Sequence, residues 1–241
     1  MSEPQLAGQT VVVIGGSAGI GLETARRARA EGADVIVTGR DPERLERAAH
    51  ELGAAGTAAF DATDLDRLER FFDDLPAPID QVLLSGGGPY YAPLAEMDFA
   101  EVRADVERHL VVPMRVACLA AGKVRPVGSL VFISGTGGRR RGMGLTLIGA
   151  LTAATPALTE NLAVEIAPIR VNLVAPGFVD TGLSASLLGE GLEARREELR
   201  ERLPIRRVVG PEDVAALSVH LMSNTALTGG TYDIDGGQKL V

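Results

Sequence analysis

The stretch that decides the fold is residues 10–21, TVVVIGGSAGIG. Its first five residues are β-branched, which is typical of a buried strand, and a glycine-rich turn leads directly into the helical pattern of residues 20–31. Glycine permits a positive φ and lets backbone amides approach a phosphate group at the positive end of a helix. This order of strand, glycine turn and helix predicts a site for the pyrophosphate of a dinucleotide.

Strand and helix patterns alternate along the rest of the chain. β-Branched runs predict strands over residues 10–14, 34–38, 57–61, 81–85, 129–134, 170–175 and 231–235. Apolar spacing predicts helices over residues 20–31, 42–52, 64–75, 98–122, 146–166 and 211–222. Such alternation favours a parallel sheet with helices on both faces. No linker divides the 241 residues, so we expect one doubly wound, Rossmann-type α/β domain over residues 1–241.

Composition and charge exclude several classes of protein. The formal net charge is -8 and the only basic cluster is residues 139–141, whereas nucleic-acid binding needs a basic surface. Residues 1–8 lack a charged segment followed by a long apolar run, and no apolar stretch approaches the roughly eighteen residues of a membrane span. We therefore expect a cytoplasmic protein with no membrane or nucleic-acid partner.

The one cysteine, Cys118, lies in an apolar helical segment, where we expect a buried, inert thiol and no metal site.

The end of the second predicted strand bears on the choice of dinucleotide. That strand ends in Thr38-Gly39-Arg40. An acidic side chain at this point would accept hydrogen bonds from a free ribose 2′-hydroxyl, whereas a guanidinium pairs with a 2′-phosphate in bidentate fashion. Arg40 therefore predicts NADP(H). The alternative is a surface arginine in the loop, and Asp41 beside it carries the opposite charge.

Further motifs follow the glycine-rich turn in a fixed order. Residues 85–88 read SGGG, residues 176–181 read PGFVDT, and residues 229–237 read GGTYDIDGG. With the turn at residues 14–21, these motifs resemble the short-chain dehydrogenase/reductase superfamily over essentially the whole chain. The resemblance implies a seven-stranded sheet in the order 3-2-1-4-5-6-7 and a family aspartate, Asp61, that receives the adenine amino group. It implies that the cofactor is bound by Gly15, Ser17, Ala18, Gly19, Ile20, Gly21, Gly39, Arg40, Asp61, Ala62, Ser85, Gly86, Gly87, Pro176, Gly177, Val179 and Thr181.

The family's catalytic set is replaced in this chain. The family uses a tyrosine to protonate the carbonyl oxygen, a lysine to lower the pKa of that tyrosine, a serine to orient the carbonyl and an asparagine on the preceding helix. The chain has no tyrosine between residues 92 and 231, and its only lysines are Lys123 and Lys239. The positions that match the tyrosine, lysine, serine and asparagine are Ile148, Thr152, Gly135 and His109.

A carbonyl reduction without the tyrosine needs another proton donor, because general acid catalysis is typically worth about 10² to 10⁴ in rate. The candidates are His109, whose imidazole can protonate an oxyanion, Ser134 at the end of the fifth predicted strand, and Tyr90 or Tyr91 after the residue 85–88 motif. Each has a structural alternative, namely a hydrogen bond or packing within the fold. Residues 139–141 are either a site for an anionic substrate or a solvated loop.

Three functions fit these observations. The first is an NADP(H)-dependent reductase of a carbonyl or activated double bond in a small organic substrate, with a non-standard or substrate-supplied proton donor. The second is a catalytically inactive cofactor sensor or partner subunit of a complete reductase, and the third is a non-redox lyase, cyclase or isomerase. We expect residues 183–203 to form a substrate lid, with a solvated helix pair as the alternative. The resemblance implies a homodimer or homotetramer, or a hetero-oligomer with another chain of this family.

Overall fold

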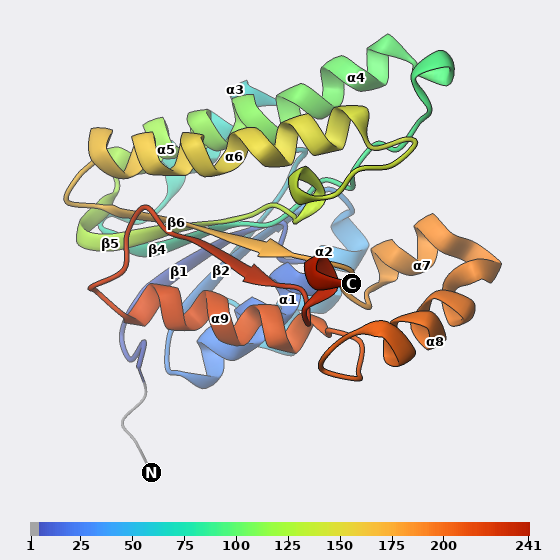
Figure 1. The fold of residues 1–241 in the computed structure, drawn as a ribbon. Helices are drawn as coiled ribbons and strands as arrows, with labels where there is room; N and C mark the ends of the chain where they lie inside the picture. The colour runs from blue at the N-terminus through green and yellow to red at the C-terminus, as the bar shows by residue number, and fades with distance from the viewer. Residues whose placement is uncertain (1–4) are drawn as a thin grey trace.

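Seven parallel strands build one sheet in the order β3-β2-β1-β4-β5-β6-β7 (Figure 1), which confirms the predicted topology. The computed structural model describes residues 5–241. Because every crossover joins parallel strands, the carboxyl ends of all seven strands meet at one edge, where ligands bind in this class of fold. The strands are β1 (Thr10–Ile14), β2 (Asp34–Gly39), β3 (Gly56–Ala59), β4 (Ile79–Leu84), β5 (Val124–Ile133), β6 (Arg170–Pro176) and β7 (Thr231–Ile234).

Helices cover both faces of the sheet. Figure 1 shows α3, α4, α5 and α6 on one side and α1, α2 and α9 on the other, with α7 and α8 near the carboxyl ends of the strands. The helices are α1 (Gly19–Ala30), α2 (Pro42–Leu52), α3 (Leu65–Asp74), α4 (Phe99–Val106), α5 (Val112–Ala121), α6 (Thr146–Glu165), α7 (Gly182–Leu188), α8 (Leu192–Arg202) and α9 (Pro211–Ser223).

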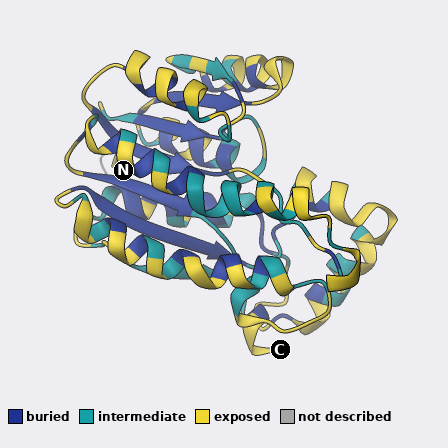
Figure 2. Ribbon diagram, turned by 90° about the horizontal axis from the view of Figure 1, so that it is seen from above, coloured by how far each residue is buried: buried dark blue, intermediate teal, exposed yellow. Residues whose placement is uncertain are grey.

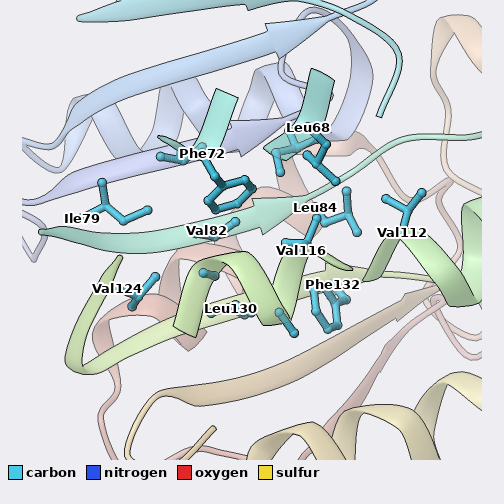
Figure 3. Packing of buried hydrophobic residues seen from close by; sticks show 14 of the residues in the cluster. Leu68, Phe72, Ile79, Val82, Leu84, Val112, Val116, Val124, Leu130 and Phe132 are labelled. Atoms are coloured by element: carbon cyan, nitrogen blue, oxygen red, sulfur yellow. The ribbon is translucent and has the colours of Figure 1, made fainter. Parts of the chain in front are cut away.

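The two faces have separate hydrophobic clusters because successive side chains of a strand point in opposite directions. In β1, Val12 and Ile14 belong to the cluster beneath α3 and α5, whereas Val11 and Val13 belong to the cluster beneath α1 and α9. Figure 3 shows the first cluster, in which Phe72 and neighbouring helical side chains meet the strands. Figure 2 shows the strands buried and the outer faces of the helices exposed. The two clusters pack the helices against both faces of the sheet and so hold the carboxyl ends of the strands in place.

Residues 98–122 were expected to form one helix, and the structure divides them. α4 and α5 flank a π-helical turn, Glu107–Val111, in which the Val112 N–H donates to the Glu107 carbonyl five residues earlier. The apolar spacing of the segment does not reveal such a turn, because one extra residue shifts the buried face only locally. A π-helical turn is frequent at functional sites, and this one contains His109.

The prediction of a buried Cys118 is wrong, because this residue is exposed. α5 buries Val112, Val116, Ala117 and Ala120 against the sheet, and Cys118 lies on its outer surface. An apolar helix with small residues on every side does not show from its sequence which face is buried.

One helix among residues 5–241 is long and apolar enough to cross a membrane by length and composition alone. It is α6. A core helix of a soluble protein passes the same test, and α6 lies along the sheet, where Thr155, Thr159 and Leu162 are buried. Of the apolar window in α6, 33% is buried within the described residues.

Candidate functional site

The glycine-rich turn between β1 and α1 packs backbone against backbone. Gly15 has a φ of +85°, and a Cβ on it would lie 1.5 Å from the carbonyl oxygen of Ser85 at the end of β4. A Cβ on Gly21 would lie 2.1 Å from the carbonyl oxygen of Gly15. No side chain fits at either position. The two glycines therefore bring the turn, the start of α1 and the end of β4 into direct contact, as a dinucleotide cradle requires.

The amino end of α1 is open to an anion. Its N-cap is Ala18, and among the described residues no side chain caps this helix and no acidic residue occupies its first turn. α2, α3 and α4, by contrast, begin at aspartates whose carboxylates accept backbone N–H groups. The free amides and the positive end of the helix dipole suit a pyrophosphate. The residues present thus fit the predicted cofactor.

Arg40 lies beside the carboxylate of Asp61, with its Nη1 3.6 Å from Oδ2. Burial raises the pKa of Asp61, but hydrogen bonds from the Thr63 backbone and hydroxyl outweigh it, and with Arg40 they hold this pKa below its ordinary value. The Arg40 side chain is 72% exposed, so most of the guanidinium is free for a second anion. Gly39 before it leaves room for Ser17, whose Oγ would lie 2.6 Å from a Cβ at residue 39.

The loop after β6 meets the glycine-rich turn. A Cβ on Gly19 would lie 3.6 Å from the Thr181 methyl group, and the Thr181 side chain caps α7. A Cβ on Gly177 would lie 2.4 Å from Oε1 of Gln238, which accepts the Phe178 N–H. The structure therefore brings together the predicted cofactor residues of three loops. Of these residues, Ser85, Pro176 and Val179 are buried, whereas Arg40, Asp61, Gly86 and Gly87 are exposed.

The positions matched to the family's catalytic serine, tyrosine and lysine lie together. Ile148 and Thr152 are one turn apart at the start of α6, and both are buried. The Thr152 hydroxyl donates to the Ile148 carbonyl at 2.7 Å, and a Cβ on Gly135 would lie 3.7 Å from the Thr152 methyl group. These three residues offer no acid or base, and the one hydroxyl among them is bonded to the backbone.

Two of the candidate donors use their hydroxyls within the fold. The Ser134 Oγ lies 2.9 Å from the Oγ1 of buried Thr155, and the Tyr90 hydroxyl accepts the Asp98 N–H at 2.9 Å. Ser134 thus ties β5 to α6, and Tyr90 braces the start of α4. Neither partner is visible from the sequence, because each bond joins segments that the fold brings together.

The third candidate, His109, has a buried acidic neighbour that the sequence reasoning missed. Its Nδ1 lies 3.0 Å from the Asp105 carbonyl oxygen and 3.3 Å from the carboxylate Oδ1. Asp105 is fully buried and also accepts from Arg108, whose Nη2 is 3.1 Å from Oδ1, and from the Tyr90 N–H at 3.3 Å. The only signal in the sequence is the spacing of four between Asp105 and His109, which is common on helix surfaces.

The three arginines at residues 139–141 do not act as one cluster. Arg139 pairs with Asp233, and Arg141 donates to the carbonyl oxygens of Gly138 and Arg140. Arg140 and Arg141 line a hollow of about 380 Å³ at the start of α6.

Arg140 also acts on Tyr91. Burial of the phenol raises the pKa of Tyr91, the charge of Arg140 opposes this rise, and the charge of Asp105 adds to it.

The segment expected to form a lid folds as α7 and α8. Leu183 of α7 lies over the glycine loop after β4, since a Cβ on Gly88 would be 3.1 Å from its Cδ1. Arg196 of α8 holds Asp180 through two hydrogen bonds of 2.9 and 2.7 Å. These contacts place the segment beside the cofactor loops.

Fold and site together define a dinucleotide-binding α/β protein. The family described as enoyl-(acyl carrier protein) reductase matches residues 15–239. The chain is 30% identical to the short-chain dehydrogenase/reductase ATR9 of Stachybotrys chlorohalonatus, over 98% of this chain and 99% of that protein. The chain belongs to the short-chain dehydrogenase/reductase superfamily, as its motifs indicate.

Solved structures agree with this assignment. The reductase/Diels-Alderase MalC of Malbranchea aurantiaca superposes with a TM-score of 0.92 at 27% identity, covering 100% of both chains. A variant of actinorhodin polyketide ketoreductase, solved with NADPH, superposes with a TM-score of 0.89 at 27% identity, covering 97% of this chain and 98% of that chain.

Proposed function

We propose that this protein is an NADP(H)-dependent reductase that acts on a carbonyl or activated double bond of a small organic substrate with a non-standard proton donor. The observation that carries the proposal is the glycine cradle, in which Gly15 and Gly21 leave no room for any side chain. Such close backbone contact beside an uncapped helix lets backbone amides bind a pyrophosphate at the helix N-terminus. The NADPH in the ketoreductase structure supports the same choice of cofactor.

The residues of this chain divide the work of holding the cofactor. The amides at the start of α1 would bind the pyrophosphate, Arg40 the 2′-phosphate, and Asp61 the adenine amino group. The loops at Ser85–Gly87 and Pro176–Thr181 would enclose the nicotinamide half. When bound, the cofactor supplies a hydride, and the chain must orient the acceptor and provide a proton. The positions of Gly135, Ile148 and Thr152 provide none, so the active site is atypical for the family.

Replacing Arg40 by alanine is expected to weaken NADPH binding about 10-fold to 100-fold, because a charge-assisted hydrogen bond to phosphate contributes roughly 1.5–3 kcal/mol. NADH lacks the 2′-phosphate, so its affinity should change less than about threefold. Fluorescence titration of both cofactors measures the difference. R44A is a matched control, since Arg44 is a neighbouring exposed arginine, and its backbone N–H, which donates to the capping Asp41 carboxylate, is retained in the variant. Equal losses of NADPH and NADH affinity in R40A would contradict the 2′-phosphate role.

Turnover itself is tested with a panel of ketones, aldehydes and conjugated enones. We expect NADPH absorbance to fall faster than in an enzyme-free control for at least one class of substrate, with a reduced product visible by mass spectrometry. The R40A protein should show the same product with a raised KM for NADPH. An inert wild-type protein that still binds NADPH would contradict the reductase function and favour a cofactor sensor or inactive partner subunit.

A cyclisation without net redox is the second candidate. The similar structure of MalC carries both reductase and Diels-Alderase in its name, and here Ile148 and Thr152 give the start of α6 an unreactive lining. Conversion of a substrate at constant NADPH absorbance would distinguish this function from reduction.

We also propose that the protein is cytoplasmic and forms a homodimer or homotetramer through α4, α5 and α6, or a hetero-oligomer with another member of the family. Exposed apolar side chains on these helices, Phe99, Met114 and Val164, support such an interface. α7 and α8 would serve as the substrate lid, because Leu183 already contacts the loop that faces the nicotinamide site.

A further inference from the structure

The imidazole of His109 is held in one orientation by Asp105. Nδ1 lies within hydrogen-bond distance of the Asp105 backbone oxygen and close to its carboxylate, at 3.0 and 3.3 Å. Both neighbours are acceptors, so Nδ1 must carry the hydrogen. The second ring nitrogen, Nε2, is therefore the one that can exchange a proton with a ligand, as in the histidine of a carboxylate–histidine pair.

Nε2 of His109 remains open. Among residues 5–241 this nitrogen has no hydrogen-bond partner. It is also not fully buried. The side chain is 14% exposed, so the ring is mostly enclosed while this nitrogen stays accessible. Arg108, the preceding residue, packs against Gly87, since a Cβ there would lie 3.2 Å from its Cδ. His109 thus lies in the turn that borders the cofactor loop after β4.

Asp105 is prepared to stabilise a charged imidazole. Burial raises the pKa of Asp105, but its hydrogen bonds with His109, the Tyr90 N–H and Arg108 lower it below the ordinary value. The carboxylate therefore stays ionised despite being fully buried. The other charged or titratable groups around the pair are Arg108 and Glu101 on the same helical segment and Tyr91 and Arg140 on the facing loops.

We propose that His109, positioned by Asp105, donates the proton in the reductase reaction, in place of the family's tyrosine. This inference rests on the proposed function. The donor is the imidazolium form of His109, which carries a hydrogen on both ring nitrogens. The carbonyl carbon accepts a hydride while the carbonyl oxygen takes the proton from Nε2, so a carbonyl, NADPH and a proton give an alcohol and NADP⁺. Neutral His109 then regains a proton from water. His109 is the catalytic residue of this step, and Asp105 is a positioning residue.

The pair can be tested without turnover by NMR of histidine-labelled protein, with and without NADP⁺. The chain has three histidines, and His50 and His220 are exposed internal references. We expect neutral His109 to carry its hydrogen on Nδ1, and its ring nitrogen resonances to shift in D105N, because the carboxylate 3.3 Å from Nδ1 is lost. E101Q, which removes an exposed carboxylate on the same helix, is the control and should leave these resonances unchanged. Hydrogen on Nε2, or no shift in D105N, would overturn the proposal.

Turnover of the substrate found by the panel gives the second arm. H109Q should reduce kcat about 10²-fold to 10⁴-fold, as expected for loss of a general acid, with NADPH affinity unchanged. D105N should lower kcat less than H109Q and change the pH profile of kcat, whereas E101Q should keep the wild-type profile. Y91F tests the neighbouring phenol and should retain turnover. An active wild-type protein with equally active H109Q contradicts this inference alone, whereas an inert wild-type protein contradicts the proposed function.

Discussion

Replacing Arg170 by lysine is expected to lower the free energy of unfolding by about 3–5 kcal/mol, because several buried carbonyl groups lose their donor at roughly 1–3 kcal/mol each. Arg170 begins β6 and is 5% exposed. Its guanidinium donates to the carbonyl oxygens of Leu221 and Met222 at 2.7 Å each. It also donates to those of Val127, Asn224 and Leu227 at 3.1–3.2 Å.

This one side chain closes the carboxyl end of α9, where carbonyl groups lack helical partners and the helix dipole favours a cation. The ammonium of lysine has three donors on a single nitrogen, whereas the planar guanidinium spreads five donors over three nitrogens. Lysine therefore cannot reach the Val127 carbonyl and the carbonyls at the end of α9 together. Each buried carbonyl left without a donor costs roughly 1–3 kcal/mol.

Urea unfolding of R170K, compared with the wild type, measures the loss. R29K is the matched control, because Arg29 is exposed and its Nη1 donates to one backbone carbonyl, that of Ala33, at 2.9 Å. That change should stay within about 0.5 kcal/mol. A similar small effect in R170K would show that the five carbonyl contacts contribute little to stability.

Replacing Gly15 by alanine is expected to abolish measurable NADPH binding and to lower the free energy of unfolding by more than about 3 kcal/mol, because overpacking and backbone strain add. The new Cβ would lie 1.5 Å from the Ser85 carbonyl oxygen, and the residue would have to keep a φ of +85°. The turn must therefore move away from β4. That movement separates the two loops that enclose the cofactor.

Gly53 provides the control for Gly15. It also has a positive φ, +56°, at the end of α2, but no heavy atom of the described residues lies within 4 Å of a Cβ placed there. G53A should therefore cost only the strain of a left-handed residue, about 1–2 kcal/mol, with NADPH affinity unchanged. NADPH affinity is measured by titration calorimetry and stability by urea unfolding, for both variants. The comparison separates the cost of a left-handed φ from the cost of the steric clash with the Ser85 carbonyl oxygen. Unchanged NADPH affinity in G15A would contradict the tight packing of the cradle.

The site was predictable where its signals are local. The glycine-rich turn and Arg40 can be recognised because each follows a predicted strand. Parallel topology places the carboxyl ends of such strands at one edge of the sheet. Asp105 was missed because a carboxylate four residues before a histidine on a helix looks like an ordinary surface charge. Only tertiary packing shows that it is fully buried. Cys118 was misplaced for the converse reason, since an apolar helix does not reveal its buried face.

The strand order, the family and the glycine-rich turn after β1 could all be inferred from the chain of amino acids, because β-branched runs, glycine positions and motif spacing act through local backbone preferences. The tertiary structure decided what the side chains of the site can do. It joined the Ser134 hydroxyl to that of Thr155, it made the Tyr90 hydroxyl an acceptor for the Asp98 N–H, and it buried Asp105 against His109. The physical reason is that burial and hydrogen bonds between distant segments set whether a polar group is free to react, and neither is encoded in the neighbouring residues.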